Sequence, residues 1–433
     1  MKIAILRERR ANETRVAVSP EAVKKYAALG CEVAVEKTAG AGAAYTDAAF
    51  KAAGAAIAKD AAAACKGVAV ILKVQRPEPA ELGAMPAGAV LVAMLDPHRA
   101  GNELQAIAGA GLTAFAMELM PRITRAQSMD VLSSQANLAG YKAVLDAAGE
   151  YGRIYPMLMT AAGRINPAQL LVMGVGVAGL QAIATARRLG AVVHATDVRP
   201  AAKEQVESLG GKFVAVEDEE FRQAETAAGY AKEMSEDYKK KQAALIAETL
   251  PKMDVVITTA AIPGRPAPKL ISAAMVKSMK PGSVIVDLAV ETGGNCELTE
   301  AGKVVVKHGV KIVGHLNVPG RLAADASMLY ANNLFNFVSL LYDKESKELA
   351  IDWEDEIVRG TLVTRDGAVV HPDLKPTEAA PAPAPPATKV EPESMPESRV
   401  EMSDKDAAED AAQDTAQSDA AESDGAEEAK SDG

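Results

Sequence analysis

The sequence contains few cysteines, and none are spaced as in a metal site or a redox motif. Cys31, Cys65 and Cys296 lie far apart in a chain of 433 residues. The simplest interpretation is a protein of a reducing compartment with neither a disulfide framework nor a bound metal. No Ser/His/Asp or Cys/His arrangement indicates a covalent nucleophile. His308 and His315, in the strand-like segment KHGVKIVGH, have no metal-binding partner at a useful spacing.

Long hydrophobic runs and a surplus of positive charge are also missing. The longest nearly apolar stretch, 170–186, is too short to span a membrane and contains three glycines. Ile3–Ile5 is too short for a signal-peptide core. The net charge is −11, yet residues 376–433 carry 16 acidic and 4 basic side chains, so residues 1–375 are left at about +1. This balance excludes direct membrane insertion and a basic field for nucleic acid.

Short strands alternate with helices through most of the chain, which predicts parallel sheets of the α/β class. We expect two Rossmann-like doubly wound domains with a cleft between them. The N-terminal domain is predicted to be discontinuous, built from 1–130 and 321–372, and the second domain to cover 131–320. Residues 376–433 are rich in Ala, Pro, Glu, Asp and Ser and predict a disordered acidic tail.

Several elements are indicated by local signals. Ser19-Pro20-Glu21 predicts a capped helix ending near Gly30, and further helices are expected over 131–149 and 323–342. The segment 303–313 has the composition of a strand. Near the end of the patterned sequence, Asp366-Gly367 predicts a hairpin turn that returns the chain to the N-terminal domain.

The most informative segment is LVMGVGVAGLQAIATARRLGAVVHATDVR at 171–199. Gly174-x-Gly176-x-x-Gly179 follows an apolar run and opens a helix, and Asp197 ends the next apolar run. Such glycines let the backbone turn tightly and approach a pyrophosphate, which the helix N-terminus favours. Asp197 is placed to bind an adenosine ribose and to repel a 2′-phosphate. We therefore predict a dinucleotide site that prefers NAD(H), although Arg199 leaves NADP(H) open as the alternative.

The densest group of polar side chains lies at 120–137, MPRITRAQSMDVLSSQAN, between the two predicted domains. A capped helix with an ordinary linker would explain this composition, with Ser128 or Asp130 starting the helix. The functional interpretation is that these side chains surround a nicotinamide carboxamide at the domain cleft.

Two interpretations also stand for 217–250, which is rich in Glu, Lys and Ala. A solvated helix face is typical of such a charge run. As an insertion between Rossmann strands, the segment could instead be a lid, with Gly229 as hinge and Tyr230 covering a bound nucleotide.

Five segments together resemble one family. The opening MKIAILRERRANETRVAVSPEAV, LKVQRP at 72–77, MELMPRITRAQSMDVLSSQANLAGY at 117–141, the glycine fingerprint, and VDLAVETGGNC at 286–296 are similar to the NAD(H)-binding domain of proton-translocating NAD(P) transhydrogenase. The form that they resemble is the alpha subunit split off without membrane helices. The resemblance covers about 1–372 and leaves the acidic tail out.

The resemblance implies NAD contacts residue by residue. Gln127 is implied nearest the meeting of the two nicotinamide rings, with Arg122, Asp130 and Ser133 acting beside it. The full implied set of cofactor-binding residues comprises the polar loop, the glycine turn, the ribose acid and its neighbours, the lid and the segments after it: Arg122, Ile123, Thr124, Gln127, Ser128, Met129, Asp130, Ser133, Gly174, Gly176, Val177, Gly179, Asp197, Val198, Arg199, Gly229, Tyr230, Gln242 and Ala261.

The related alanine dehydrogenases supply the enzyme alternative. There an Arg and a Lys hold the substrate carboxylate, and Arg15 and Lys73 match them. The catalytic His of the dehydrogenase would fall in Ala93–Pro97, which has none, and its catalytic Asp corresponds to Glu291. His98 lies close enough to keep this alternative open, and an NAD-binding regulatory module without catalysis is a third.

The resemblance further implies the assembly in which the chain works. NADH bound here would pass hydride to NADP⁺ on a beta subunit, coupled to proton movement through a membrane-spanning subunit. The chain itself is expected to be a homodimer, cytoplasmic and peripheral on the inner membrane through those partners.

Overall fold

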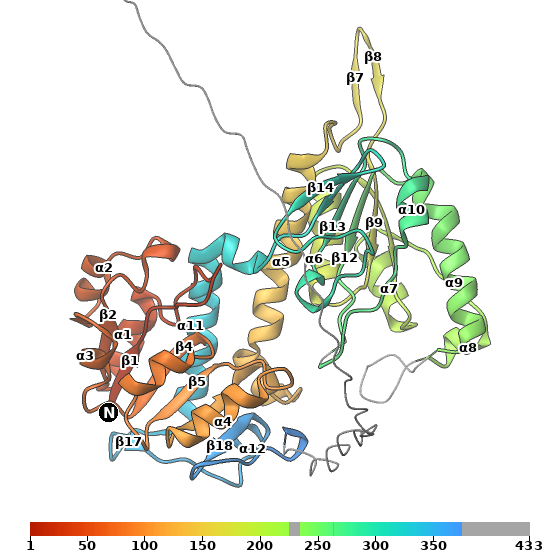
Figure 1. The fold of residues 1–433 in the computed structure, drawn as a ribbon. Helices are drawn as coiled ribbons and strands as arrows, with labels where there is room; N and C mark the ends of the chain where they lie inside the picture. The colour runs from red at the N-terminus through yellow and green to blue at the C-terminus, as the bar shows by residue number, and fades with distance from the viewer. Residues whose placement is uncertain (225–233, 263, 375–433) are drawn as a thin grey trace, which may run out of the picture. The chain divides into compact units, whose positions relative to one another are not determined.

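The computed structural model describes residues 1–224, 234–262 and 264–374. The predicted hinge residues Gly229 and Tyr230 and the predicted acidic tail lie outside the described residues. Figure 1 shows two sheets, each with helices packed on it. Both belong to the compact unit Met1–Thr377. The predicted α/β class is confirmed.

The first sheet is built mainly by the N-terminal part of the chain. Its strand order is β19-β18-β6-β5-β4-β1-β2-β3, in which β1 to β6 run parallel and β18 joins β6 antiparallel. The chain order therefore reverses between β1 and β4, as in a doubly wound sheet. The strands are β1 (Lys2–Ile5), β2 (Glu32–Glu36), β3 (Ala56–Ala58), β4 (Val70–Gln75), β5 (Val90–Met94), β6 (Thr113–Ala116), β18 (Leu362–Arg365) and β19 (Ala368–Val369).

Helices with small apolar faces cover this sheet. The predicted Ser19 cap is confirmed, because its hydroxyl accepts from the Ala22 amide at the start of α1. The hairpin predicted at Asp366-Gly367 is also confirmed as β18–β19, and it lies at the edge of the first sheet. The helices of this part are α1 (Pro20–Ala28), α2 (Asp47–Ala52), α3 (Ala61–Cys65), α4 (Gly101–Gly109), α11 (Ala323–Leu340) and α12 (Glu356–Thr361).

The second sheet has the order β11-β10-β9-β12-β13-β15-β14. All neighbours run parallel except β14 and β15, and the chain order reverses between β9 and β12. Strands buried on both faces, such as Leu170–Val172, explain the unbroken apolar runs in the sequence. The strands are β9 (Gln169–Met173), β10 (Val192–Thr196), β11 (Lys212–Phe213), β12 (Val255–Thr258), β13 (Val284–Asp287), β14 (Val304–Lys307) and β15 (Val310–Val313).

The prediction of one strand over 303–313 is wrong. The segment forms two antiparallel strands, and His308 and Gly309 make the turn between them. Both residues have positive φ, 54° and 79°, so the chain reverses where the apolar pattern continues. His308 accordingly lies in a turn.

Two long helices link the sheets. The predictions of helices near 131–149 and 323–342 are confirmed by α5 (Val131–Glu150) and α11, which contact each other. The remaining helices of the second part are α6 (Val177–Arg188), α7 (Ala201–Ser208), α8 (Glu219–Arg222), α9 (Glu236–Thr249) and α10 (Ala273–Ser278).

Two small hairpins lie outside the main sheets. One is β16 (Tyr342–Asp343) with β17 (Glu348–Leu349), and the other is β7 (Leu158–Thr160) with β8 (Gly163–Ile165). The β7–β8 hairpin projects from the body of the second sheet (Figure 1). Among the described residues, no helix is both long and apolar enough to cross a membrane.

Candidate functional site

The glycine fingerprint forms a tight turn between β9 and α6. Gly174 has φ 99°, and a Cβ at Gly179 would lie 2.0 Å from the carbonyl oxygen of Gly174, so neither position accepts a side chain without strain. A Cβ on Gly176, by contrast, would meet no atom within 4 Å. The backbone at Gly176 therefore faces open space beside the N-terminus of α6, as close approach of a pyrophosphate requires.

Asp197 follows β10 and braces this turn. One carboxylate oxygen accepts from the Val175 amide at 2.7 Å, and the other accepts from the Arg199 amide at 2.9 Å. The Arg199 guanidinium donates to both oxygens, at 2.9 and 3.0 Å, and also to the Val175 carbonyl. The acid predicted to bind the ribose thus lies directly beside the glycine turn, and its charge is paired with Arg199.

The polar loop predicted at 120–128 contains a short 3₁₀ helix, Thr124–Met129, that is held from outside. Arg125 donates to both carboxylate oxygens of Asp355, at 2.5 and 2.9 Å. The Ser128 carbonyl accepts from Asn333 at 2.9 Å and from Asn336 at 3.1 Å, both on α11. These three contacts fix the loop backbone, while the side chains of Arg122 and Gln127 are exposed.

Asp130, not Ser128, starts α5. Its carboxylate accepts from the Ser133 amide at 2.9 Å and also bonds the Ser133 hydroxyl. The cap explains part of the polar composition that the sequence showed here. It also fixes the positions of Asp130 and Ser133 relative to the loop.

α5 joins the loop to the fingerprint helix. Gly140 lies against the first turn of α6: a Cβ there would lie 2.0 Å from the Ala178 carbonyl oxygen. Ser133 and Gly140 are seven residues apart, which is about 10 Å along the helix axis. One helix therefore spaces the two parts of the predicted site.

The segment after β12 borders the same turn. Thr259 donates from its amide to Met173 and from its hydroxyl to the Gly174 carbonyl, each at 2.9 Å. Ala261, predicted as a cofactor contact, is exposed two residues later. Gln242 on α9 donates to the Thr196 hydroxyl at 2.8 Å and accepts from Val216, so it lies beside the end of β10.

The first sheet has polar groups at its own point of strand reversal. Arg15 is buried and donates to Glu13 twice, at 2.8 and 2.7 Å, and to Gln135 at 2.8 Å. Lys73 donates to Glu81 at 2.9 Å and lies 3.4 Å from Glu8. A hollow of about 240 Å³ beside them is lined in part by Glu8, Glu13 and Arg15. The two cations matched to a carboxylate-binding pair are thus each held by the chain's own acids.

The positions matched to dehydrogenase catalysis are also engaged. Leu95 is fully buried, and Asp96 has φ 51° and pairs with Arg99. The Glu291 carbonyl accepts from Arg99 at 3.0 Å, and its carboxylate accepts from the Asn317 amide at 3.3 Å. His98 packs against Gly264.

Glu118, just before the polar loop, is enclosed. Oε1 accepts from the Asp96 amide, and no partner for Oε2 is found in the described part of the chain. Burial raises the pKa of this carboxyl from 4.5 to about 7, against the lowering effect of backbone hydrogen bonds. The protonated form is therefore favoured by folding, and the stability that it contributes is lost as the pH rises from 4.5 through 7.

Replacing Glu118 by Gln is expected to remove this pH dependence. The wild type should lose on the order of 3 kcal/mol of unfolding free energy, relative to the variant, between about pH 5 and about pH 8. Urea unfolding of both proteins at the two pH values measures the difference. Parallel pH profiles would contradict the assignment.

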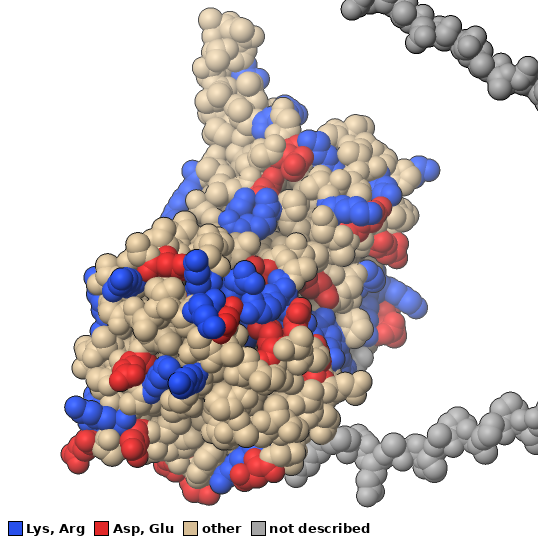
Figure 2. Space-filling model, turned by 60° about the vertical axis from the view of Figure 1, so that its left-hand side comes forward, with Lys and Arg blue, Asp and Glu red and all other residues tan. Residues whose placement is uncertain are grey.

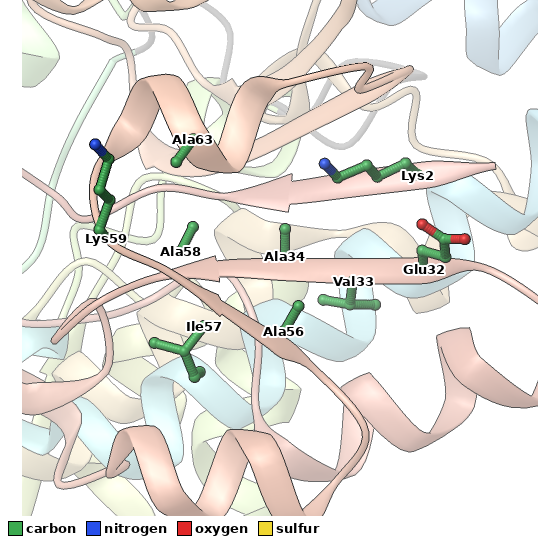
Figure 3. A pocket seen from close by; sticks show the side chains of 9 residues that line it. All are labelled: Lys2, Glu32, Val33, Ala34, Ala56, Ile57, Ala58, Lys59 and Ala63. Atoms are coloured by element: carbon green, nitrogen blue, oxygen red, sulfur yellow. The ribbon is translucent and has the colours of Figure 1, made fainter.

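A larger hollow, of about 400 Å³, lies at the β3 edge of the first sheet. Figure 3 shows that small side chains line it, with Lys2, Glu32 and Lys59 at its rim. None of the predicted site residues takes part in it.

Sequence reasoning missed the residues that hold the site in place. Asn333, Asn336 and Asp355 fix the polar loop, and Thr259 supports the glycine turn. Their sequence neighbourhoods show no motif. Asn295, which contacts Ala260, lies in the quoted VDLAVETGGNC segment but had no role assigned.

Comparison with known proteins identifies the family. The chain matches the Alanine dehydrogenase/PNT N-terminal domain over residues 4–139 and the C-terminal domain over residues 143–372. A Rhodospirillum rubrum protein, named as the first portion of a divided NAD(P) transhydrogenase subunit alpha, is 62% identical over 379 residues. The match covers 86% of this chain and 99% of that relative.

A solved structure and a more distant relative agree with this match. A transhydrogenase from Sinorhizobium meliloti superposes with a TM-score of 0.78 at 57% identity, covering 86% of this chain and all of the other. An alanine dehydrogenase of Halomonas elongata is 30% identical over 381 residues, covering 86% of this chain and 95% of its own. The transhydrogenase interpretation is therefore favoured over the dehydrogenase.

Proposed function

Since the chain belongs to the alanine dehydrogenase/PNT family, we propose that it is the NAD(H)-binding component of a proton-translocating NAD(P) transhydrogenase. In this proposal NADH held by this chain passes hydride to NADP⁺ on a partner subunit. The observation that carries it is the Gly174–Gly179 turn, open at Gly176, with the Asp197 carboxylate beside it. The residues present fit a dinucleotide that lacks a 2′-phosphate.

The proposed contacts divide along α5 and the second sheet. Asp197, Val198 and Arg199 would bind the adenosine ribose, and Gly174, Gly176, Val177 and Gly179 the pyrophosphate. The nicotinamide end would lie against the polar loop: Arg122, Ile123, Thr124, Gln127, Ser128, Met129, Asp130 and Ser133. Gln242 and Ala261 border the same region, and Gly229 and Tyr230 belong to the proposed lid.

The side chains suit hydride transfer between two rings. When bound, the nicotinamide supplies the hydride. Reduction of an imine or carbonyl also requires a positioned proton donor, whereas transfer to a second nicotinamide does not. The chain has only to orient one ring, exclude water and leave the reacting face accessible. The exposed Gln127 on a loop fixed from behind by Asn333 and Arg125 supports this role.

Reconstitution tests the proposal. The chain should bind NADH alone and, mixed with the NADP-binding subunit, transfer hydride from NADH to an NADP analogue. Binding with no effect on transhydrogenation would instead indicate a regulatory module. NADH formation from NAD⁺ and L-alanine would indicate a dehydrogenase and overturn the proposal.

Shortening Gln127 to Asn is expected to slow hydride transfer roughly tenfold while changing NADH affinity less, because misplacement near the reacting atoms by about 1 Å costs rate steeply. Single-turnover kinetics and fluorescence titration measure the two effects. Gln205→Asn, at an exposed position on α7, is the matched control. Equal losses of rate and affinity would refute the role.

We also propose the assembly and the domain division. Residues 1–130 with 321–372 would form the N-terminal domain and 131–320 the nucleotide domain, a division supported by the pairing of β18 with β6. The partners would be an NADP-binding beta subunit and a membrane-spanning subunit. The chain would then be peripheral on the cytoplasmic face of the inner membrane.

The β7–β8 hairpin supports a homodimer. Met159 is 69% exposed, and Met157, Leu158 and Ile165 are also exposed. Figure 2 shows this projection as largely uncharged. Contiguous exposed apolar side chains mark interaction surfaces. Sedimentation should show a dimer that Met159→Lys weakens, and a wild-type monomer at micromolar concentration would refute it.

A further inference from the structure

The loop after β13, which contains the ETGGN sequence, is fixed by a buried carboxylate. Asp287 is 1% exposed and accepts four hydrogen bonds. Its donors are the hydroxyls of Thr258 and Thr299 and the amides of Ala289 and Cys296, at 2.9–3.1 Å. Since every donor is within the second sheet or this loop, the loop has one defined course.

Two glycines return this loop to the end of β12. Gly293 and Gly294 have φ values of 102° and 77°, and a Cβ at Gly294 would lie 2.7 Å from Asp287 Oδ2. Only glycine fits this turn without strain. The turn places the next residue, Asn295, fully inside the protein.

The Asn295 amide clamps the segment that follows β12. Oδ1 accepts from the Ala260 amide at 3.1 Å, and Nδ2 donates to the Ala260 carbonyl at 2.9 Å and to the Pro268 carbonyl at 2.8 Å. Both backbone groups of Ala260 are therefore satisfied by one side chain. A residue without both a donor and an acceptor here would leave buried polar groups unpaired.

The clamp continues to the fingerprint turn. Ala260 follows Thr259, whose hydroxyl donates to the Gly174 carbonyl at 2.9 Å. A Cβ at Gly174 would lie 2.7 Å from that hydroxyl and 3.1 Å from the Ala260 amide, so the two segments are in direct contact. Asn295 therefore fixes one wall of the turn without contacting the open side at Gly176.

The strand order indicates which end of the ligand this wall faces. In a doubly wound sheet a dinucleotide lies across the strand reversal, one nucleotide over each half of the sheet. Asp197, at the end of β10, marks the adenosine half. The segment 259–261 follows β12, the first strand of the other half.

We propose that Asn295 is a positioning residue for the nicotinamide half of the coenzyme. It holds the backbone of 259–261 at the carboxyl end of β12 and, through Thr259, the wall of the glycine turn. The proposal rests on the proposed function, since it takes NAD(H) as the ligand. It gives the ETGGN segment a role in binding that requires no contact with the coenzyme.

Affinity for two ligands tests this role. In Asn295→Ala the dissociation constant for NADH should rise about tenfold or more, because two buried backbone groups lose their partners. Affinity for AMP, which occupies only the adenosine half, should change less than about twofold. Thr259→Val, which removes one hydroxyl at constant size, should shift the same ratio in the same direction. Asn332→Ala, at a position on α11 that pairs with Lys25, is the control and should change neither affinity.

Each outcome decides the proposal. Loss of NADH affinity with unchanged AMP affinity supports positioning, and equal loss for both ligands overturns it in favour of general damage to the fold. Unchanged affinity for both ligands overturns it as well. If Asn295→Ala does not fold, Thr259→Val decides by the same criteria. Failure of the wild type to bind NADH would refute the proposed function itself and is distinguishable from these results.

Discussion

Replacing Gly140 by alanine is expected to destabilise the protein by about 2 kcal/mol and to weaken NADH binding. Alanine favours a helix over glycine by about 1 kcal/mol, so propensity alone predicts stabilisation. The new Cβ, however, would lie 2.0 Å from the Ala178 carbonyl oxygen and 2.8 Å from its carbonyl carbon. Both are backbone atoms, so α5 and α6 must separate, and overpacking of this kind commonly costs about 1–3 kcal/mol or more.

The same helix supplies a matched control. A Cβ at Gly149 would meet nothing within 4 Å, so Gly149→Ala should stabilise the protein by up to about 1 kcal/mol. Urea denaturation measures both variants. NADH titration of Gly140→Ala tests whether displacement of the first turn of α6 disturbs the pyrophosphate site. Equal stability of the two variants would show that the helices do not cross as described.

Replacing Asp197 by alanine is expected to weaken NADH binding about 100-fold, or about 2.7 kcal/mol. The variant loses the charge-assisted bonds proposed for the ribose, which are worth about 1.5–3 kcal/mol each, and also the acceptor for the Val175 amide. It also releases Arg199 from its partner. The affinity for NADPH relative to NADH should therefore rise, because a 2′-phosphate would meet a guanidinium in place of a carboxylate.

Fluorescence titration with both coenzymes measures this change. Asp197→Asn separates charge from shape, since it keeps an oxygen near Val175 while removing the negative charge. It should restore part of the NADH affinity without restoring discrimination against NADPH. Unchanged NADH affinity in Asp197→Ala would remove this residue from the ribose.

The sequence predicted the parts of the site that depend on neighbours along the chain. The strand, turn and helix around Gly174, and the placement of Asp197 at the end of the next strand, follow from local patterns. The single strand over 303–313 was wrong because valines and isoleucines continue through a two-residue reversal at His308 and Gly309. Hydrophobic composition alone does not locate such a turn.

The supports of the site lay beyond sequence reasoning. The bond from Asn333 to Ser128 joins residues 205 apart, and the pair of Arg125 and Asp355 joins residues 230 apart. The contact of Asn295 with Ala260 spans 35 residues. Polar side chains of this kind show no periodicity, and their partners are defined only once the sheets have formed.

The single helix that runs from the Asp130 cap to the crossing at Gly140 acts as a gauge. One residue inserted or deleted between these points would shift the polar loop by about 1.5 Å and rotate it by about 100° relative to the fingerprint helix. Point substitutions along the exposed side of this rod preserve its length. The separation of loop and phosphate turn thus depends on a residue count, and evolution can vary the rod's surface freely only while that count is kept.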